Sequence, residues 1–302
     1  MAERAGELKR AAARDAAALA VAYERCRAIT RAGARNFYYA FLTLPRARRR
    51  AIYAAYAFCR LCDDIADEPG QQGDRGRRLD RVRARLSAAF EGKPEGEVFV
   101  ALADAAARYR IPQRYFADVI TGVEMDLSPA RYSTFEELKN YCYHVAGAVG
   151  LICIQVCEYS DQKATEYAVD LGIAMQLTNI LRDVEQDAHA GRIYLPAEDM
   201  ARFGYTEQDL EAGVVDERLR ALVKFEVERA RGYFASGQNL LPLLDRRSRA
   251  CPRVMFDIYQ GLLSRIERRN YDVFGKRISL SKPAKLSIVA RLWLRSLIPL
   301  PG

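Results

Sequence analysis

The sequence predicts an all-α protein, and three observations support this fold class. Long stretches rich in Ala, Leu, Arg and Glu are interrupted only at proline or glycine positions, a pattern typical of helices. No two segments of alternating hydrophobicity are joined by an Asn-Gly turn, the usual signal of a β-hairpin. Half of the 302 residues are hydrophobic, which is enough for a sizeable buried core.

Proline and glycine divide the chain into successive helices whose apolar residues recur at spacings of three and four. In the first half these breaks are Pro45, the Pro69-Gly70 pair, Gly92 to Pro94, Pro112 and Pro129. The second half continues in the same way, without a Ser- or Gly-rich linker or an abrupt change of composition. We therefore expect one domain over residues 1–302, with an N-terminal helix over 1–30 and a basic amphipathic tail over 282–302.

The two ends of the chain bear on its location. Charges throughout the Ala-rich N-terminal helix leave no apolar core like that of a signal peptide, so a cytoplasmic location is expected. The tail mixes apolar residues and Trp293 with Lys285, Arg291 and Arg295, and it is too short and too charged to span a bilayer. Such a helix could make peripheral contact with the inner face of the membrane, but a terminal helix packed on its own domain would have the same pattern. Both interpretations stay open.

Composition excludes several classes of site. Two histidines are too few for a His-rich metal site and argue against a Ser/His/Asp hydrolase. The seven cysteines include no second pair at the spacing of a zinc site, so we interpret them as reduced core thiols. The net charge of +8 suits nucleic acid, an anionic membrane surface or an anionic small substrate. The arginine-rich runs lack interleaved aromatic residues, so we expect a solvated surface and no nucleic-acid partner.

A first cluster of carboxylates lies in the segment RLCDDIAD, residues 60–67. Asp63 and Asp67 share one face of the expected helix, while Asp64 points roughly 100° away. The preceding segment is strongly apolar, and clustered aspartates repel one another unless a cation compensates. Taken alone, this motif is explained more simply by a solvated helix end in which Arg60 pairs with Asp64.

A second row of oxygen-bearing side chains follows in the segment that begins at Leu171. Gln176, Asn179, Asp183 and Asp187 form a stripe that drifts only about 40° per step, on a helix that is apolar over most of its surface. Buried carboxylates are costly unless they are paired or bind a metal. Two such rows facing one another would form a cage for magnesium, which completes its shell with phosphate oxygens and so implies a phosphorylated ligand.

Three further segments carry a resemblance to a known family. NFYYAFLTLP precedes the first cluster, YCYHVAGAVG lies between the two, and GRIYLP follows the second. With the two aspartate motifs, they resemble the squalene and phytoene synthase family from about Asn36 to Arg277. The resemblance implies a single helical domain of the isoprenoid-synthase type with a central cavity. It also implies a magnesium-dependent prenyltransferase that joins two prenyl diphosphates head to head through a cyclopropyl diphosphate intermediate.

The resemblance assigns roles position by position. The implied metal ligands are Asp63, Asp64, Asp67, Asn179, Asp183 and Asp187. The implied catalytic residues are Tyr56, Tyr141, Tyr259 and Arg60. The implied substrate-binding residues are Arg35, Asn36, Phe41, Tyr53, Gln176, Arg182, Tyr194 and Arg277. One departure is Asn36, which stands where many relatives have serine. For any single tyrosine, core packing with a satisfied hydroxyl is the simpler interpretation.

The resemblance also bears on the substrate. Phe41 and Tyr53 occupy positions where bulky side chains in similar enzymes shorten the pocket, which favours two farnesyl diphosphates and formation of presqualene diphosphate, then squalene or dehydrosqualene. The alternative is a phytoene synthase that uses two geranylgeranyl diphosphates. NADPH would be a cofactor only if the product is squalene, and no Gly-rich dinucleotide motif is evident.

Two alternatives come from other classes. A terpene cyclase would share the metal motifs but would not need YCYHVAGAVG and GRIYLP. A non-catalytic basic helical protein of the membrane surface would suit the net charge, but it leaves both aspartate rows unexplained.

Overall fold

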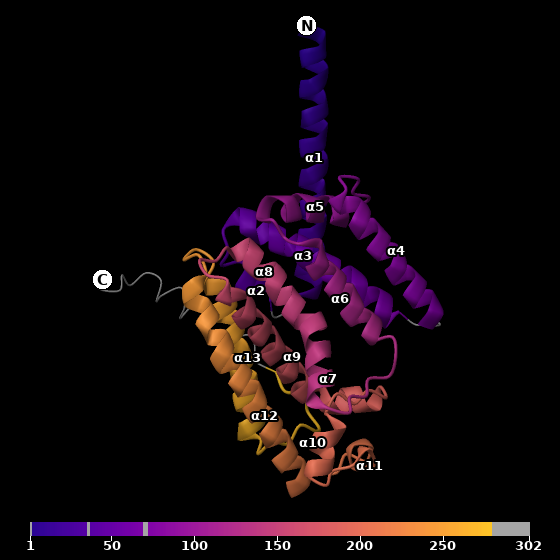
Figure 1. Ribbon diagram of the computed structural model, residues 1–302, viewed down its shortest axis with the longest axis vertical. Coiled ribbons are helices and arrows are strands. Elements are labelled where there is room, and N and C mark those ends of the chain that lie inside the picture. Colours follow the sequence, from indigo (N-terminus) through magenta and orange to yellow (C-terminus); the bar gives the residue numbers. More distant parts are fainter. Residues whose placement is uncertain (1, 35–36, 69–71, 280–302) are drawn as a thin grey trace, which may run out of the picture.

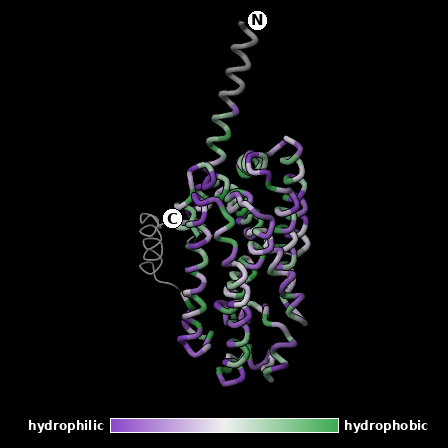
Figure 2. Tube along the Cα trace, turned by 60° about the vertical axis from the view of Figure 1, so that its left-hand side comes forward, coloured by the Kyte–Doolittle hydropathy of each residue, from purple (hydrophilic) through white to green (hydrophobic). Residues whose placement is uncertain are grey.

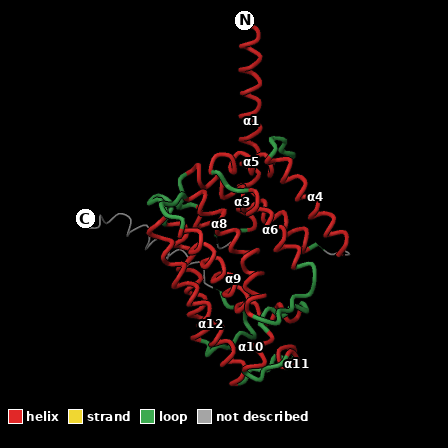
Figure 3. Tube along the Cα trace, in the orientation of Figure 1, coloured by secondary structure: helices red, strands yellow, loops and turns green. Residues whose placement is uncertain are grey.

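The computed structural model describes residues 2–34, 37–68 and 72–279. All the named secondary-structure elements within these residues are helices (Figure 3). The prediction of an all-α protein is therefore confirmed. The elements are α1 (Ala2–Gly33), α2 (Tyr38–Phe41), α3 (Arg46–Asp67), α4 (Gln72–Phe90), α5 (Glu97–Tyr109), α6 (Gln113–Met125), α7 (Phe135–Cys142), the π-helical turn η1 (Tyr143–Gly147), α8 (Ala148–Cys157), α9 (Lys163–His189), α10 (Ala197–Arg202), α11 (Glu207–Glu211), α12 (Glu217–Gly237), the 3-10 turn η2 (Gln238–Leu243) and α13 (Ala250–Arg268).

Two long helices organise the body (Figure 1). α9 packs against α8, α12, α13 and η1, whereas α3 packs against α1, α5, α6 and α8. α3 and α9 line the same cavity from different sides. Along most helices hydrophobic and hydrophilic positions alternate (Figure 2), as expected for helices that bury one face. The first part of α1 extends beyond the other helices.

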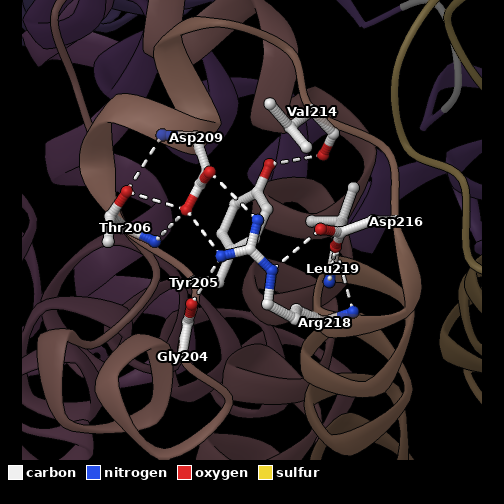
Figure 4. Close-up of polar contacts among 8 residues, drawn as sticks. All are labelled: Gly204, Tyr205, Thr206, Asp209, Val214, Asp216, Arg218 and Leu219. Carbon is white, nitrogen blue, oxygen red and sulfur yellow. Dashed lines mark hydrogen bonds and ion pairs between the residues drawn. The ribbon is translucent and has the colours of Figure 1, made fainter.

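Several helix boundaries follow from local sequence. α3 begins after Pro45 and α6 after Pro112, because proline suits the start of a helix. α12 begins at the cap Asp216, whose carboxylate accepts hydrogen bonds from the backbone N–H of Arg218 at 3.0 Å and of Leu219 at 3.1 Å. The Arg218 guanidinium also binds Asp209 of α11 (Figure 4), so this corner is held by charge as well as by capping.

The segment η1 is enclosed by two glycines from neighbouring helices. A Cβ on Gly172 of α9 would lie 2.6 Å from the carbonyl oxygen of Ala146, and one on Gly122 of α6 would lie 3.0 Å from the carbonyl carbon of His144. Any side chain at either position would meet backbone, which cannot move aside cheaply. Glycine on both sides therefore allows α6 and α9 to approach η1 closely.

The helical stretch Phe135–Cys157 is long and apolar enough, by composition, to cross a membrane. Half of its most apolar window is buried, and it packs between α6 and α9. The need to form a core accounts for its apolarity, and the same composition is common in core helices. The predicted tail over 282–302 lies outside the described residues, so its membrane contact stays a prediction.

We expect Gly172→Ala and Gly122→Ala to lower the free energy of unfolding by roughly 1–3 kcal/mol, because the added methyl group strains a packed contact. Urea denaturation followed by circular dichroism measures the change. The matched control is Gly232→Ala on α12, where an added Cβ meets nothing within 4 Å. That variant should gain about 0.5–1 kcal/mol, since alanine favours the helix. Equal effects at all three positions would show that the approach to η1 is not tight.

Candidate active site

An apolar cavity of about 290 Å³ lies between α3, α8, α9 and α13. Its walls are almost entirely apolar, and its polar lining residues are Tyr56, Gln176, Asn179 and Tyr259. Tyr259 is buried, as is Phe41, which also lines the cavity. The structure therefore brings five of the predicted site residues to one cavity. An apolar space with a polar end suits a ligand that has a hydrocarbon chain and a polar head.

Tyr53 differs from its prediction because it does not line this cavity. Its side chain is 3% exposed, and its ring stacks on that of Tyr38 with centroids 6.0 Å apart. The ring centroid of Phe41, which does line the cavity, lies 6.3 Å from that of Tyr53. Tyr53 therefore supports the wall without facing the space inside.

Four thiols line the cavity, from Cys59, Cys153, Cys157 and Cys251. All seven cysteines are free, in agreement with the interpretation as reduced core thiols. Burial raises the pKa of Cys153 to about 12 and that of Cys157 to about 11. These thiols therefore stay protonated at neutral pH, so they are poor nucleophiles in the wall of the cavity.

The first row of carboxylates lies at the C-terminal end of α3. Asp63 keeps solvent-accessible surface, yet the surrounding protein raises the pKa of its carboxyl to about 7. Burial is the largest cause, Arg60 opposes it, and the charges of Asp67, Asp126 and Asp64 add to it. Because the Asp63 carboxyl keeps accessible surface although protein surrounds it, it lies in a recess. Asp64 itself forms an ion pair with Arg60, the arrangement that the sequence offered as the simpler interpretation.

The second row lies on α9, which is mostly buried between Leu171 and Val184, in agreement with the predicted burial. Asn179 donates to the Gln176 side chain at 3.2 Å, while its own Oδ1 is buried without a hydrogen-bond partner in the described part of the chain. Burial raises the pKa of Asp187 to about 6, with Arg192 lowering it and Asp183 and Asp126 raising it further.

Asp126, the residue after α6, connects the two rows. Its charge contributes to the raised pKa of both Asp63 on α3 and Asp187 on α9. It accepts hydrogen bonds from the hydroxyls of Tyr141 at 2.9 Å and Tyr194 at 3.1 Å. Burial raises the pKa of Asp126 itself, and the two tyrosine hydrogen bonds oppose the shift. The predicted Tyr141 and Tyr194 thus meet at a carboxylate that the sequence analysis missed.

The position of Asp126 in the sequence gives no indication that this residue belongs to the site. It is a single carboxylate at a helix end, outside both stripes, and only its contacts in the folded protein identify it. Tyr132 was missed as well. Its ring lies 5.5 Å from that of Tyr141 and 6.1 Å from that of Tyr194, so three tyrosines surround Asp126.

Two predicted arginines converge on Asp183. Arg277 donates through Nε at 2.9 Å to Oδ1 and through Nη2 at 3.0 Å to Oδ2. Arg182 binds the same two oxygens, with its Nε 3.0 Å from Oδ1. Arg35 and Asn36, the remaining predicted substrate-binding residues, lie outside the described residues.

The donor set of the two rows fits magnesium, although no three His, Cys, Asp or Glu side chains among the described residues are close enough to chelate an ion. Magnesium prefers oxygen ligands and usually completes its shell with water and substrate phosphate. Burial raises the pKa of Asp63 and of Asp187, neighbouring carboxylates add to both shifts, and Asn179 Oδ1 is a buried acceptor without a donor among the described residues. A cation held jointly with a phosphorylated ligand would satisfy all three groups.

The chain is similar to known proteins in both sequence and structure. The chain matches the squalene/phytoene synthase family over residues 30–284. It is 43% identical to the 15-cis-phytoene synthase of Synechococcus elongatus, over 94% of this chain and 96% of that protein. It is 42% identical to the 15-cis-phytoene synthase of Synechocystis sp., over 94% of this chain and 88% of that protein. The crystal structure of a dehydrosqualene synthase superposes with a TM-score of 0.84 at 31% identity, covering 92% of this chain and 98% of that one.

These matches confirm the predicted family resemblance, the isoprenoid-synthase fold with its central cavity, and a prenyltransferase of this kind. The terpene cyclase and the non-catalytic membrane-surface protein, by contrast, find no support in them. With a family match that covers most of its length and near-complete coverage of its relatives, the chain belongs to the squalene/phytoene synthase family.

Proposed function

We propose that this protein joins two geranylgeranyl diphosphates head to head, through a cyclopropyl diphosphate intermediate, to give phytoene. The observation that carries the proposal is the identity of 42–43% with two phytoene synthases over 94% of the chain. The bulk of Phe41 and Tyr53 favours farnesyl diphosphate, whereas the phytoene synthases among the relatives favour geranylgeranyl diphosphate.

The shorter substrate is expected if both bulky side chains, Phe41 and Tyr53, shorten the cavity. Only Phe41 of the pair lines the cavity, whereas Tyr53 packs behind it against Tyr38. The expectation of a shortened cavity therefore keeps one of its two supports, Phe41. The farnesyl-based reaction stays a second candidate because a dehydrosqualene synthase is similar at a TM-score of 0.84.

The residues divide into a charged end and an apolar space. Asp63, Asp67, Asn179, Asp183 and Asp187 would hold magnesium, with Asp64 supporting, and the metal would act as a Lewis acid on the departing diphosphate. Arg182 and Arg277 lie at the same end and supply guanidinium groups suited to its oxygens. Arg60 is presently paired with Asp64 and would serve similarly once that pair opens.

Aromatic rings and apolar walls would then protect the allylic cation. Tyr56 and Tyr259 line the cavity, where their ring faces can stabilise positive charge. Asp126 fixes the orientation of Tyr141 and Tyr194 by accepting a hydrogen bond from the hydroxyl of each. The apolar walls and protonated thiols keep water and nucleophiles away from the cation.

The proposed reaction ends by loss of a proton from the rearranged cation, so it consumes no NADPH. A cytoplasmic location and peripheral membrane contact stay predictions, since the tail that would make the contact is outside the described residues.

The substrate is tested by incubating the purified protein with magnesium and either geranylgeranyl or farnesyl diphosphate, followed by mass spectrometry of the lipids. We expect a forty-carbon product from geranylgeranyl diphosphate, and no change in product or rate when NADPH is added. A dominant thirty-carbon product would assign the protein to the squalene side of the family.

The metal assignment predicts that Asp63→Asn and Asp183→Asn each lower kcat/KM by roughly a hundredfold or more, because each weakens the hold on the metal that would stabilise the departing diphosphate. Steady-state kinetics measure the loss, and circular dichroism checks that the helices persist. The control is Asp80→Asn, an exposed carboxylate on α4 that should leave activity unchanged. Near-normal turnover in either of the first two variants would remove the metal role of that residue.

The crowded carboxylates predict a pH-dependent stability. The pKa of Asp63 is about 7, above its ordinary value, so the metal-free folded protein holds this proton more tightly than the unfolded chain does. The resulting stabilisation is complete below pH ~4 and is lost as the pH rises through about 7. Asp63→Asn should therefore raise the Tm of the metal-free protein at pH 8 and do so less at pH 5. An equal shift of the Tm at both pH values would contradict the repulsion.

A further inference from the structure

The apolar cavity extends along α9, away from the aspartate rows. Its lining on this helix begins at Asn179, one turn before Asp183, and reaches back to Ala168, roughly three turns or about 16 Å away. α3 gives the same direction, because Cys59 lines the cavity one turn before Asp63. A prenyl diphosphate whose charged group is bound near the aspartates would therefore extend its hydrocarbon chain toward the other end of the cavity.

Three buried side chains from different segments meet at that far end. Cys157 is the last residue of α8 and lies a short turn before α9 begins, whereas Cys251 lies in the first turn of α13. Burial raises the pKa of Cys251, and the nearby Cys157 thiol adds to the shift. Leu244 pairs through an antiparallel bridge with Tyr159, two residues after Cys157. All three side chains line the cavity, and we refer to Cys157, Leu244 and Cys251 as the cavity floor.

An arginine outside the cavity holds this floor in place. Arg48, in the first turn of α3, forms ion pairs with Glu158 and, at 2.5 Å, with Asp245. These two carboxylates directly follow two of the floor residues in the chain. The hydrogen bond from Arg48 lowers the pKa of Asp245, so this pair stays ionised at neutral pH. Arg48 also donates to the buried Ser248 hydroxyl at 2.8 Å, and we refer to these four residues as the Arg48 clasp.

The backbone beside the clasp is also constrained. The Asp245 N–H donates to the Glu158 carbonyl at 3.0 Å, and the Ser160 N–H donates to the Leu243 carbonyl at 2.9 Å. Glu158 adopts φ 59° and ψ 143°, a conformation that residues with a Cβ rarely occupy and that costs of order 1–3 kcal/mol. Such a conformation persists only where surrounding contacts hold it. The floor is therefore positioned at a cost in stability, and the ion pair between Arg48 and Glu158 is one of the contacts that hold it.

We propose that the Arg48 clasp positions the cavity floor, and that this floor sets the longest prenyl chain that the enzyme accepts. The identity of the chain rests on the proposed function. One isoprene unit adds four bonds to the chain, about 5 Å at about 1.2 Å per bond when extended. A floor that yields by this distance would admit one further unit. Arg48 itself does not line the cavity, so it acts as a positioning residue through Leu244 and Cys157.

The floor is tested by substitutions that change its bulk. Cys157→Leu should lower the ratio of kcat/KM for geranylgeranyl over farnesyl diphosphate by about tenfold or more, the usual effect of a small misfit in an apolar pocket. Leu244→Ala should instead permit turnover of the 25-carbon homologue, geranylfarnesyl diphosphate. The matched control is Cys62→Leu on α3, a buried cysteine that does not line the cavity, and it should leave the ratio unchanged. Equal ratios in Cys157→Leu and Cys62→Leu would overturn the role of the floor.

The clasp is tested by Arg48→Met, which removes the charge and keeps most of the side-chain length. This variant should raise the ratio of kcat/KM for the 25-carbon over the 15-carbon diphosphate by about tenfold, because the floor can then yield. Arg48→Lys keeps the charge but lacks the forked donors that reach two carboxylates at once, so it should give an intermediate ratio. The matched control is Arg229→Met on α12, which also removes an arginine bound to two carboxylates, Asp199 and Glu226. It should lower the Tm without changing the ratio.

A purely structural role for Arg48 gives a different set of results. Arg48→Met and Arg229→Met would then both lower the Tm and leave the ratio unchanged, which would overturn the clasp as a determinant of chain length. If Arg48→Met does not fold, the same comparison is made with Arg48→Lys, and an unchanged ratio there has the same meaning. A thirty-carbon product from the unmodified protein would overturn the proposed function without affecting this test, because the ratios compare chain lengths and do not depend on which substrate is preferred.

Discussion

The repulsion among carboxylates that face one recess is the constraint on which the rest of the structure depends. Asp63, Asp126 and Asp187 come from three different helical segments, and the charge of Asp126 adds to the burial that raises the pKa of the other two. Such a cluster opposes folding, so it persists only because packing elsewhere holds the helices in place. The close approach of α6 and α9 to η1, through Gly122 and Gly172, provides part of that packing. Arginines compensate the remaining charge in the absence of a cation, most fully at Asp183.

The fold and one part of the site could be predicted because they follow from local spacing. The stripe from Gln176 to Asp187 needs only the helical period to be recognised, and the apolar residues around it predicted its burial correctly. Asp126 could not be found in this way, because its relation to Asp63 and Asp187 exists only between segments that are distant in the sequence. The π-helical turn in YCYHVAGAVG was also beyond prediction, since it depends on glycines contributed by two other helices.

The length of the substrate is equally difficult to predict from the sequence. Bulk at Phe41 and Tyr53 can be read from the sequence, but the direction in which each ring points cannot. Tyr53 stacks on Tyr38, so that only Phe41 of the two lines the cavity. The length of chain that a cavity accepts depends on such directions, and on residues from α8, α9 and α13 that no single motif groups together. The evolutionary relationship to phytoene synthases therefore carries more weight here than any count of large side chains.

The glycines on either side of η1 also constrain how this architecture can diverge. Where backbone touches backbone, a substitution cannot widen or narrow the space by exchanging one side chain for another. The position of this wall of the cavity is therefore set by contacts between backbones. Diversification of chain length among related enzymes, or resistance to an inhibitor that occupies the cavity, would have to arise on the opposite walls, where Phe41, Cys59 and Met255 present exchangeable side chains.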